Sequence, residues 1–369
     1  MTVSLECGGI SMNAIKYLML FFAMLGALDR MIGNRFGLGK EFEKGFMLLG
    51  NMALSMIGMI ILSPWLAEVC KPVFSFFANT LHIDPSIVPA ALFANDMGGA
   101  PLSKAVALDP ALGLFNGLIV STMMGCTISF TIPYGLTLVD KSQHREMLLG
   151  LLCGLVTIPL GCFIAGVMLH LPITALLIDL LPLVVFSLVV ALGLLFSPEI
   201  SVKIFNAFGF FIKGLITFGL ALGVLRYLTG YELIPGLATL EEGADVCLNA
   251  AAVICGAFPL MHVVSLLLKK PMKWGAKKLR VNEISVVGLV SSSATSMTTF
   301  GMIKDMDRKG VLLNAAFAVS GAFTFAGHLA FTMAFDASYI PAMIVGKLSA
   351  GILAVILANF MSTRLLATK

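Results

Sequence analysis

The sequence has few charged side chains and none of the short motifs typical of common hydrolases and nucleotide-driven enzymes. Only 12% of its 369 residues are charged and 59% are apolar, whereas soluble proteins carry roughly 25% charged residues. With so few charges to cover a water-facing surface, we expect lipid to be the main solvent. The absence of H-E-x-x-H, G-x-S-x-G and G-x-x-x-x-G-K-[ST] argues against an intramembrane protease or an ATP-driven pump. We therefore do not expect an enzyme.

Cysteine and basic residues are also arranged in ways that exclude familiar functions. The seven cysteines are an odd number without C-x-x-C spacing, which indicates neither a metal site nor a disulfide framework. We therefore expect no metal and no cofactor. The net charge of +4 comes mainly from loops rather than from a basic stripe with interleaved aromatics, so nucleic acid is not an expected partner.

Long uncharged stretches are the main positive signal. They cover residues 45–67, 110–139, 147–178, 180–198, 246–268, 284–303 and 310–335. A bilayer core requires about 20 helical residues, and transmembrane strands would instead show short alternating segments of roughly 10 residues. The pattern predicts an all-α, polytopic helical membrane protein that contacts the lipid bilayer.

Loop charges predict a re-entrant hairpin in the second half of the chain. Residues 269–280 contain six basic and no acidic residues, so this loop is expected in the cytoplasm. The loop 304–309 is also basic, which puts both flanks of 283–303 on one side. Residues 291–299 hold seven hydroxyl side chains, as broken backbone lining a polar cavity would require.

A second hairpin is predicted in the first half. When the spans are assigned alternately from the cytoplasmic loop 269–280, both ends of residues 85–107 fall outside. A helix there would be broken by Asn95, Asp96, Gly98, Gly99 and Pro101. Hairpins that enter from opposite sides are the signature of an inverted repeat.

The predicted architecture has about nine full spans plus the two re-entrant hairpins. The repeats are 13–170 and 203–361, joined by a linking span at 173–196, and segment 69–82 is interpreted as interfacial. This arrangement predicts an outside N-terminus and an inside C-terminus.

Solute binding is predicted at the hairpin tips, near the membrane midplane. The candidate residues are Asn95 and Asp96 at one tip and Ser292, Ser293 and Thr295 at the other. An intramembrane carboxylate is costly and so suggests function, but Asp96 could instead cap the second half-helix of its hairpin. The hydroxyls could likewise serve only as packing and interhelical hydrogen-bond donors.

Other intramembrane charges have simpler interpretations. Asp179 and Lys213 lie on consecutive spans, so we expect either a structural ion pair between them or snorkelling of these side chains within the bundle interior. Lys347 is expected to anchor a helix end. His262 and His328 lie in apolar spans, where hydrogen bonding within the bundle or a proton relay would both be compatible with histidine.

Several stretches resemble one known family along most of the chain. They are FFAMLGALDR (21–30), EKGFMLLGNMALSMIGM (43–59), ANDMGG (94–99), STMMGCTISFTIP (121–133) and GLVTIPLGC (154–162). Together they resemble the ethanolamine-utilisation membrane protein EutH, and the similarity runs from about Lys16 to Met361. The resemblance implies ethanolamine as the small-molecule substrate and the cytoplasmic (inner or plasma) membrane as the location. A homo-oligomer is compatible with it.

Three functional hypotheses follow. The first is an alternating-access permease for ethanolamine, in which Asp96 and the C-terminal ends of the half-helices bind the ammonium, and the hydroxyls and Asn95 bind the alcohol. The second is a passive facilitator or channel for uncharged ethanolamine, which needs no fixed counter-charge. The third is a membrane sensor or scaffold that docks a soluble partner through the basic loop 269–280.

Overall fold

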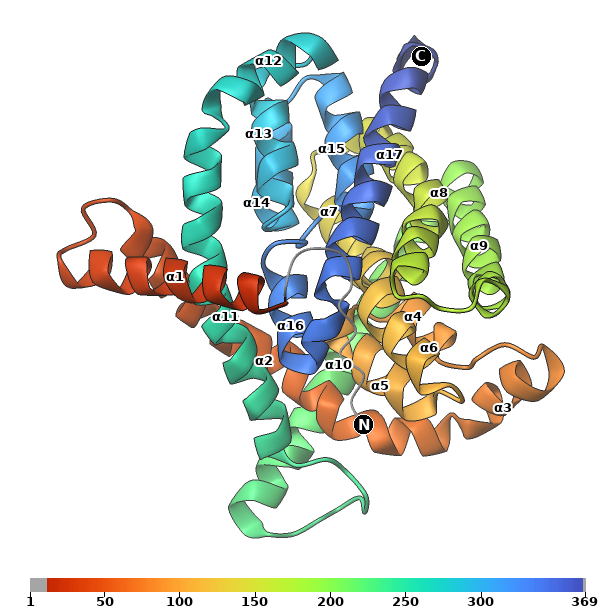
Figure 1. The fold of residues 1–369 in the computed structure, drawn as a ribbon. Coiled ribbons are helices and arrows are strands. Elements are labelled where there is room, and N and C mark those ends of the chain that lie inside the picture. Colours follow the sequence, from red (N-terminus) through yellow and green to blue (C-terminus); the bar gives the residue numbers. More distant parts are fainter. Residues whose placement is uncertain (1–11, 368–369) are drawn as a thin grey trace.

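A computed structural model describes residues 12–367, and within this range the regular structure is entirely helical (Figure 1). The α-helices are α1 (Met12–Met31), α2 (Leu38–Val69), α3 (Lys71–Thr80), α4 (Ile87–Leu92), α5 (Gly99–Val106), α6 (Pro110–Phe115), α7 (Ile132–Leu138), α8 (His144–Met168), α9 (Ile173–Phe196), α10 (Pro198–Thr229), α11 (Leu240–Leu267), α12 (Lys269–Leu279), α13 (Glu283–Ser292), α14 (Ser296–Met302), α15 (Arg308–Ser320), α16 (Gly327–Asp336) and α17 (Ile340–Ala367). The π-helices η2 (Asn116–Gly125) and η3 (Thr127–Thr131) join α6 to α7, and 3-10 turns form η1 (Asn95–Met97), η4 (Lys141–Gln143), η5 (Ile303–Asp305) and η6 (Ala337–Tyr339).

Seven helical segments of the described range are long and apolar enough to cross a membrane. They are Leu38–Val69, Pro110–Leu138, Lys141–Met168, Ile173–Phe196, Pro198–Thr229, Leu240–Leu267 and Gly327–Arg364. The chain is therefore a multi-pass membrane protein. Helix α9 has the bounds of the span that the sequence predicts at 173–196.

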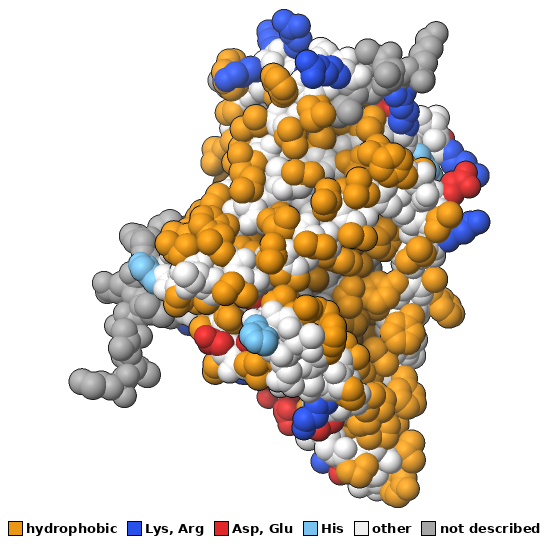
Figure 2. Space-filling view, turned by 90° about the vertical axis from the view of Figure 1, so that its right-hand side faces the viewer, with side chains coloured by type: hydrophobic (Ala, Val, Ile, Leu, Met, Phe, Trp, Pro, Cys, Tyr) orange, Lys and Arg blue, Asp and Glu red, His pale blue; other side chains and the backbone are white. Residues whose placement is uncertain are grey.

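The outer surface has the character of a lipid-facing surface. On α9, Leu181 and Val189 are 61% and 59% exposed, whereas Leu183 on another face of the helix is fully buried. Figure 2 shows apolar side chains covering the middle of the molecule, with Lys and Arg gathered mainly toward its upper end. Exposed leucine and valine side chains are favoured where hydrocarbon replaces water.

Two pairs of short helices interrupt the long ones. In the first pair, α4 and α5 are separated by residues 93–98; in the second, α13 and α14 are separated by residues 293–295. The members of each pair pack against one another. Gly98 has φ +109° in the first break, and a Cβ there would lie 2.2 Å from the side chain of Met59. Only glycine accommodates both the conformation and the close approach.

The span that follows each pair is also irregular. In the first half, residues 116–131 are mostly π-helical, and the Thr122 and Thr127 hydroxyls donate to carbonyls three and four residues earlier. Such back-bonding competes with the α-helical ladder. In the second half, residues 321–326 separate α15 from α16, and Phe323 adopts φ +60°.

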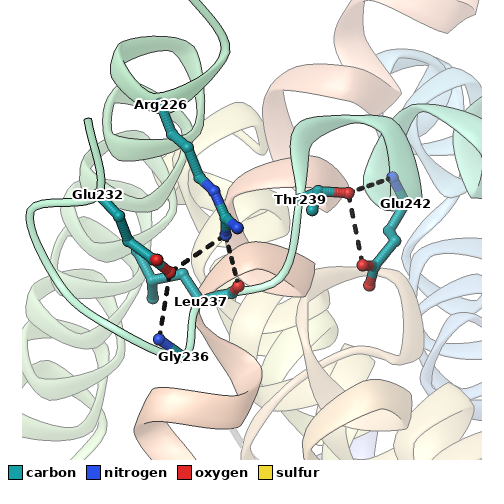
Figure 3. A network of polar contacts seen from close by, with 6 residues as sticks. All are labelled: Arg226, Glu232, Gly236, Leu237, Thr239 and Glu242. Atoms are coloured by element: carbon teal, nitrogen blue, oxygen red, sulfur yellow. Dashed lines mark hydrogen bonds and ion pairs between the residues drawn. The ribbon is translucent and has the colours of Figure 1, made fainter. Parts of the chain in front are cut away.

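The two ends of the molecule carry the connecting segments. Helix α12 crosses one end and α3 lies at the other (Figure 1). At the α10–α11 connection, Arg226 contacts Glu232 at 3.2 Å, and Glu232 also accepts a hydrogen bond from the Gly236 backbone (Figure 3). Thr239 caps α11 by accepting a hydrogen bond from the backbone N–H of Glu242. These contacts hold the acidic loop in one conformation.

Two expectations about buried charges are wrong. Asp179 is buried but forms no ion pair with Lys213, which is exposed; its partner is Asn116, at 3.1 Å. Lys347 does not anchor a helix end, because it is only 1% exposed and lies in the core of the bundle. Apolar runs identify the span but not which face of it points inward.

Candidate functional site

The first break places an unpaired amide inside the protein. Asn95 is fully buried, and neither of its side-chain polar atoms has a hydrogen-bond partner among the described residues. Asp96 is partly exposed, and the N-cap residue of α5 is Gly98 rather than Asp96. The capping interpretation of Asp96 is therefore wrong. A buried amide with no partner is costly, and its oxygen and nitrogen could accept and donate hydrogen bonds to a polar group.

The second break contains buried hydroxyls. The Ser292 hydroxyl is fully buried and has no partner within residues 12–367. Ser293 donates its hydroxyl proton to the Val290 carbonyl at 2.6 Å. Thr295 is the N-cap residue of α14 but makes no side-chain capping bond. Ser296, which the sequence places in the same cluster but not among the binding residues, also has a buried and unpaired hydroxyl.

The break between α15 and α16 connects the two sets of candidate residues. The backbone N–H groups of Phe323 and Phe325 donate to the carbonyls of Ser292 and Ser293, at 3.0 and 2.9 Å. Helix α16, which follows this break, packs against η1, the turn that contains Asn95 and Asp96. In the described part of the chain no hydrogen bond joins the two sets directly. The two sets of candidate residues are therefore connected through the broken span of α15 and α16, which contacts both of them.

The first break has an equivalent attachment. The Ala94 backbone N–H donates to the Ser129 hydroxyl of η3 at 3.1 Å. Each break between paired helices is thus hydrogen-bonded to the irregular part of the span that follows it.

Lys347 and His328 are the buried basic groups nearest to this region, and the sequence analysis did not assign Lys347 to it. The Lys347 Nζ donates to the Thr122 carbonyl in η2 at 2.7 Å. His328 is 4% exposed, its Nδ1 has no partner among the described residues, and its ring centroid lies 5.3 Å from that of Phe323. The signal for Lys347 was its position as a lone charge within an apolar span.

One cavity of about 410 Å³ opens beside the second break. Its wall includes Leu260 of α11, Ser293, Phe325 and Leu348 of α17. Because Ser293 contributes the main hydroxyl to an otherwise apolar lining, this cavity offers no counter-charge to an ammonium. Within residues 12–367, no three His, Cys, Asp or Glu side chains converge in a way that could hold a metal.

Comparison with known proteins identifies the family. The profile of the family described as "Ethanolamine utilisation protein, EutH" matches residues 12–361. The chain belongs to the EutH family. No solved structure matches it significantly.

Curated EutH relatives are similar along nearly their whole length. A protein of Listeria monocytogenes named "Probable ethanolamine permease EutH" is 41% identical over 352 residues, covering 95% of this chain and 94% of the relative. The protein of the same name from Escherichia coli K12 is 37% identical, with 92% and 93% covered. An uncharacterized protein of Bacillus subtilis, YxeR, is also 37% identical, with 95% of both chains covered.

Proposed function

We propose that this EutH-family chain is a permease that carries ethanolamine across the bacterial cytoplasmic membrane. The observation that carries the proposal is the extent of the family match, which runs from the first described helix into α17. The match therefore includes both helix pairs and all five candidate residues. Its curated relatives named as ethanolamine permeases are 37% to 41% identical, and the multi-pass fold is compatible with transport rather than with catalysis.

An inverted repeat is supported by the regular spacing of matching elements. Helix α3 begins at Lys71 directly after α2, and α12 begins at Lys269, 198 residues later, directly after α11. Asp109 caps α6 and Asp307 caps α15, again 198 residues apart. In this proposal each half contains two long helices, an interfacial helix, a re-entrant pair and two spans, and α9 links the halves.

The proposed orientation follows from charge. Helix α12 carries basic residues in its last turn, and the acidic α10–α11 connection lies at the other end of the molecule. Applying the positive-inside rule to α12 puts the second pair on the cytoplasmic side and the first pair on the outer side. The N-terminus would then be outside and the C-terminus inside.

In the proposed site, both breaks contribute groups to the recognition of the ammonium and of the alcohol. Asp96 and the carbonyl ends of α4 and α13 suit an ammonium, because helix C-termini carry partial negative charge. Asn95 and the hydroxyls of Ser292, Ser293 and Thr295 suit the alcohol, which both donates and accepts hydrogen bonds. Ethanolamine is protonated at neutral pH, as lysine is.

A carrier is favoured over an open channel by the burial of these groups. Asn95 and Ser292 are both inaccessible to solvent, as an occluded site between two gates requires. A passive facilitator for the neutral amine would need a continuous polar path instead.

The decisive test is uptake of labelled ethanolamine by proteoliposomes that contain the purified chain. We expect saturable uptake that unlabelled ethanolamine abolishes. Propylamine, which lacks the hydroxyl, should compete weakly, and ethylene glycol, which lacks the amine, should not compete. Uptake no faster than in protein-free vesicles would refute the proposal. Accumulation above equilibrium under an imposed ion gradient would separate a carrier from a facilitator.

A further inference from the structure

Asp179 is a buried carboxyl group that the proposed substrate site does not use. It lies on α9 and is 1% exposed. Its Oδ1 accepts a hydrogen bond from Asn116 Nδ2 at 3.1 Å, while its Oδ2 has no partner in the described part of the chain. One neutral donor is a poor environment for a full negative charge inside a membrane protein.

Asn116 presents a matching unpaired oxygen. This residue of η2 is fully buried, and its Nδ2 also donates to the Ser86 hydroxyl at 2.9 Å, at the start of α4. Both N–H groups of the amide are thus used, but its Oδ1 has no donor among residues 12–367. An ionised carboxylate can only accept hydrogen bonds, whereas a protonated one can donate to this oxygen.

The neighbouring charges do not neutralise an ionised Asp179. Asp84, ahead of α4, and Asp109, ahead of α6, lie within its electrostatic range and carry the same sign. From α8 the nearby titratable group is the Cys162 thiol, which also interacts with Lys347. Among the described residues no basic group forms an ion pair with Asp179, and on the adjacent α10 Lys213 is exposed.

The second half of the chain offers a comparison. Asn314, 198 residues after Asn116, donates from Nδ2 to the carbonyls of Ser285 and Gly310, at 2.8 and 2.9 Å. Within the described range its Oδ1 is also unpaired, but this asparagine hydrogen-bonds no carboxyl group there. Backbone carbonyls therefore suffice to hold an asparagine at this point of the fold, and a buried acid is not required for packing.

We propose that Asp179 binds a proton that it shares with Asn116, and that binding and release of this proton are coupled to transport. On protonation, an O–H bond forms at Oδ2 and donates to Asn116 Oδ1, while Asn116 Nδ2 continues to donate to Asp179 Oδ1. Acid and amide then form a cyclic pair that ties α9 to η2 and, through Ser86, to α4. On release the proton passes to water, the carboxylate loses its bond to Asn116 Oδ1, and the link between α9 and the first pair weakens.

Proton binding is tested first on purified protein without substrate, so this result does not depend on the proposed function. Infrared spectra should contain the carbonyl band of a protonated carboxylic acid, and Asp179→Asn should remove it. Asp84→Asn is the matched control, because both carboxyl oxygens of Asp84 accept backbone hydrogen bonds and neither is left unpaired. A band unchanged by Asp179→Asn would overturn the proposal.

Coupling, which rests on the proposed function, is tested in proteoliposomes. Wild-type accumulation of ethanolamine, corrected with protein-free vesicles for diffusion of the neutral amine, should respond to an imposed pH gradient. In Asp179→Asn this response should be lost, while exchange of labelled for unlabelled ethanolamine at equal pH stays within about twofold. A retained response would overturn the coupling, as would a sodium-driven uptake that Asp179→Asn abolishes. Absence of all wild-type transport would refute the proposed function and leave the infrared result to decide proton binding.

Discussion

The Thr127 hydroxyl donates a hydrogen bond of 3.0 Å to the carbonyl oxygen of Val319. Thr127 begins η3 in the first half, and Val319 lies one residue before the end of α15 in the second. The bond therefore joins the irregular part of the first span to the last turn of α15, just before the break in the second span. The Met123 carbonyl, within the same span, lies 2.7 Å from this hydroxyl, so its single proton is shared between the two carbonyls.

Replacing Thr127 tests whether this connection matters. Thr127→Val keeps the shape and removes both bonds, so the free energy of unfolding should fall by about 1 kcal/mol and uptake should slow. Thr137→Val is the control, because the Thr137 hydroxyl is exposed and bonds only to Pro133 of its own helix. Thermal unfolding in detergent and initial uptake rates would be measured together. Equal effects of the two variants would contradict the prediction.

If Asp96 binds the substrate as proposed, we expect its charge to select the protonated form of ethanolamine. Asp96→Asn keeps the size and removes one negative charge, so loss of a charged hydrogen bond of roughly 1.5 to 3 kcal/mol should weaken the apparent affinity for ethanolamine about ten- to a hundred-fold. Uptake kinetics at several external pH values would measure this. If the neutral amine is carried, affinity should hardly change and uptake should rise with pH as the uncharged fraction grows.

Asp140→Asn is the matched control for Asp96→Asn. Asp140 lies in a loop outside the spans, where hydrogen bonds from the backbone and side chain of Ser142 lower the pKa of its carboxyl group. It therefore stays ionised over the assay range, and its replacement removes one charge far from the proposed site. The affinity for ethanolamine should be that of the wild type.

Two aspartates, Asp84 and Asp307, each connect the segment before a helix pair to the segment after it. Asp84 accepts hydrogen bonds from the backbone N–H groups of Ser86, Leu108 and Asp109. Asp307 accepts them from Asn282 and Gly310. Each aspartate joins residues about 25 positions apart in the sequence, before and after the pair.

Removing either aspartate should loosen a pair. Asp84→Ala and Asp307→Ala each leave backbone donors unpaired, so each should lower the free energy of unfolding by about 3 kcal/mol. The control is Asp336→Ala, because Asp336 contacts only Ser338, two residues away. Thermal unfolding midpoints would decide, and a midpoint drop no larger than in the control would count against the proposed role.

Lys213 should limit stability rather than support it. It is exposed near the middle of α10, one of the seven membrane-crossing segments, and a lysine at the bilayer centre costs about 2.5 to 3.5 kcal/mol. Lys213→Leu should therefore raise the unfolding temperature in lipid nanodiscs. Lys203→Leu, near the start of the same helix, should have a smaller effect because Lys203 reaches the interface. A lower unfolding temperature for Lys213→Leu would indicate a partner for its charge.

The sequence alone indicated that the helices lie in lipid, and it predicted much of the local structure. Uncharged runs longer than a bilayer require lipid, and they predicted α9 at its observed bounds. Asn95 and Gly98 fall in the break between α4 and α5, so this break could also be predicted, whereas Gly99 and Pro101 lie in the first turn of α5. The hydroxyl-rich segment likewise coincides with the break between α13 and α14.

Only the tertiary structure decided which groups meet. Lys347 bonds to Thr122, 225 residues away, and Asp179 bonds to Asn116 rather than to Lys213. Hydropathy records how apolar a span is, but it does not say which face turns inward or which helix lies beside it. Those choices depend on packing between distant segments, and they determine whether a buried charge is an anchor, a proton site or part of the substrate pathway.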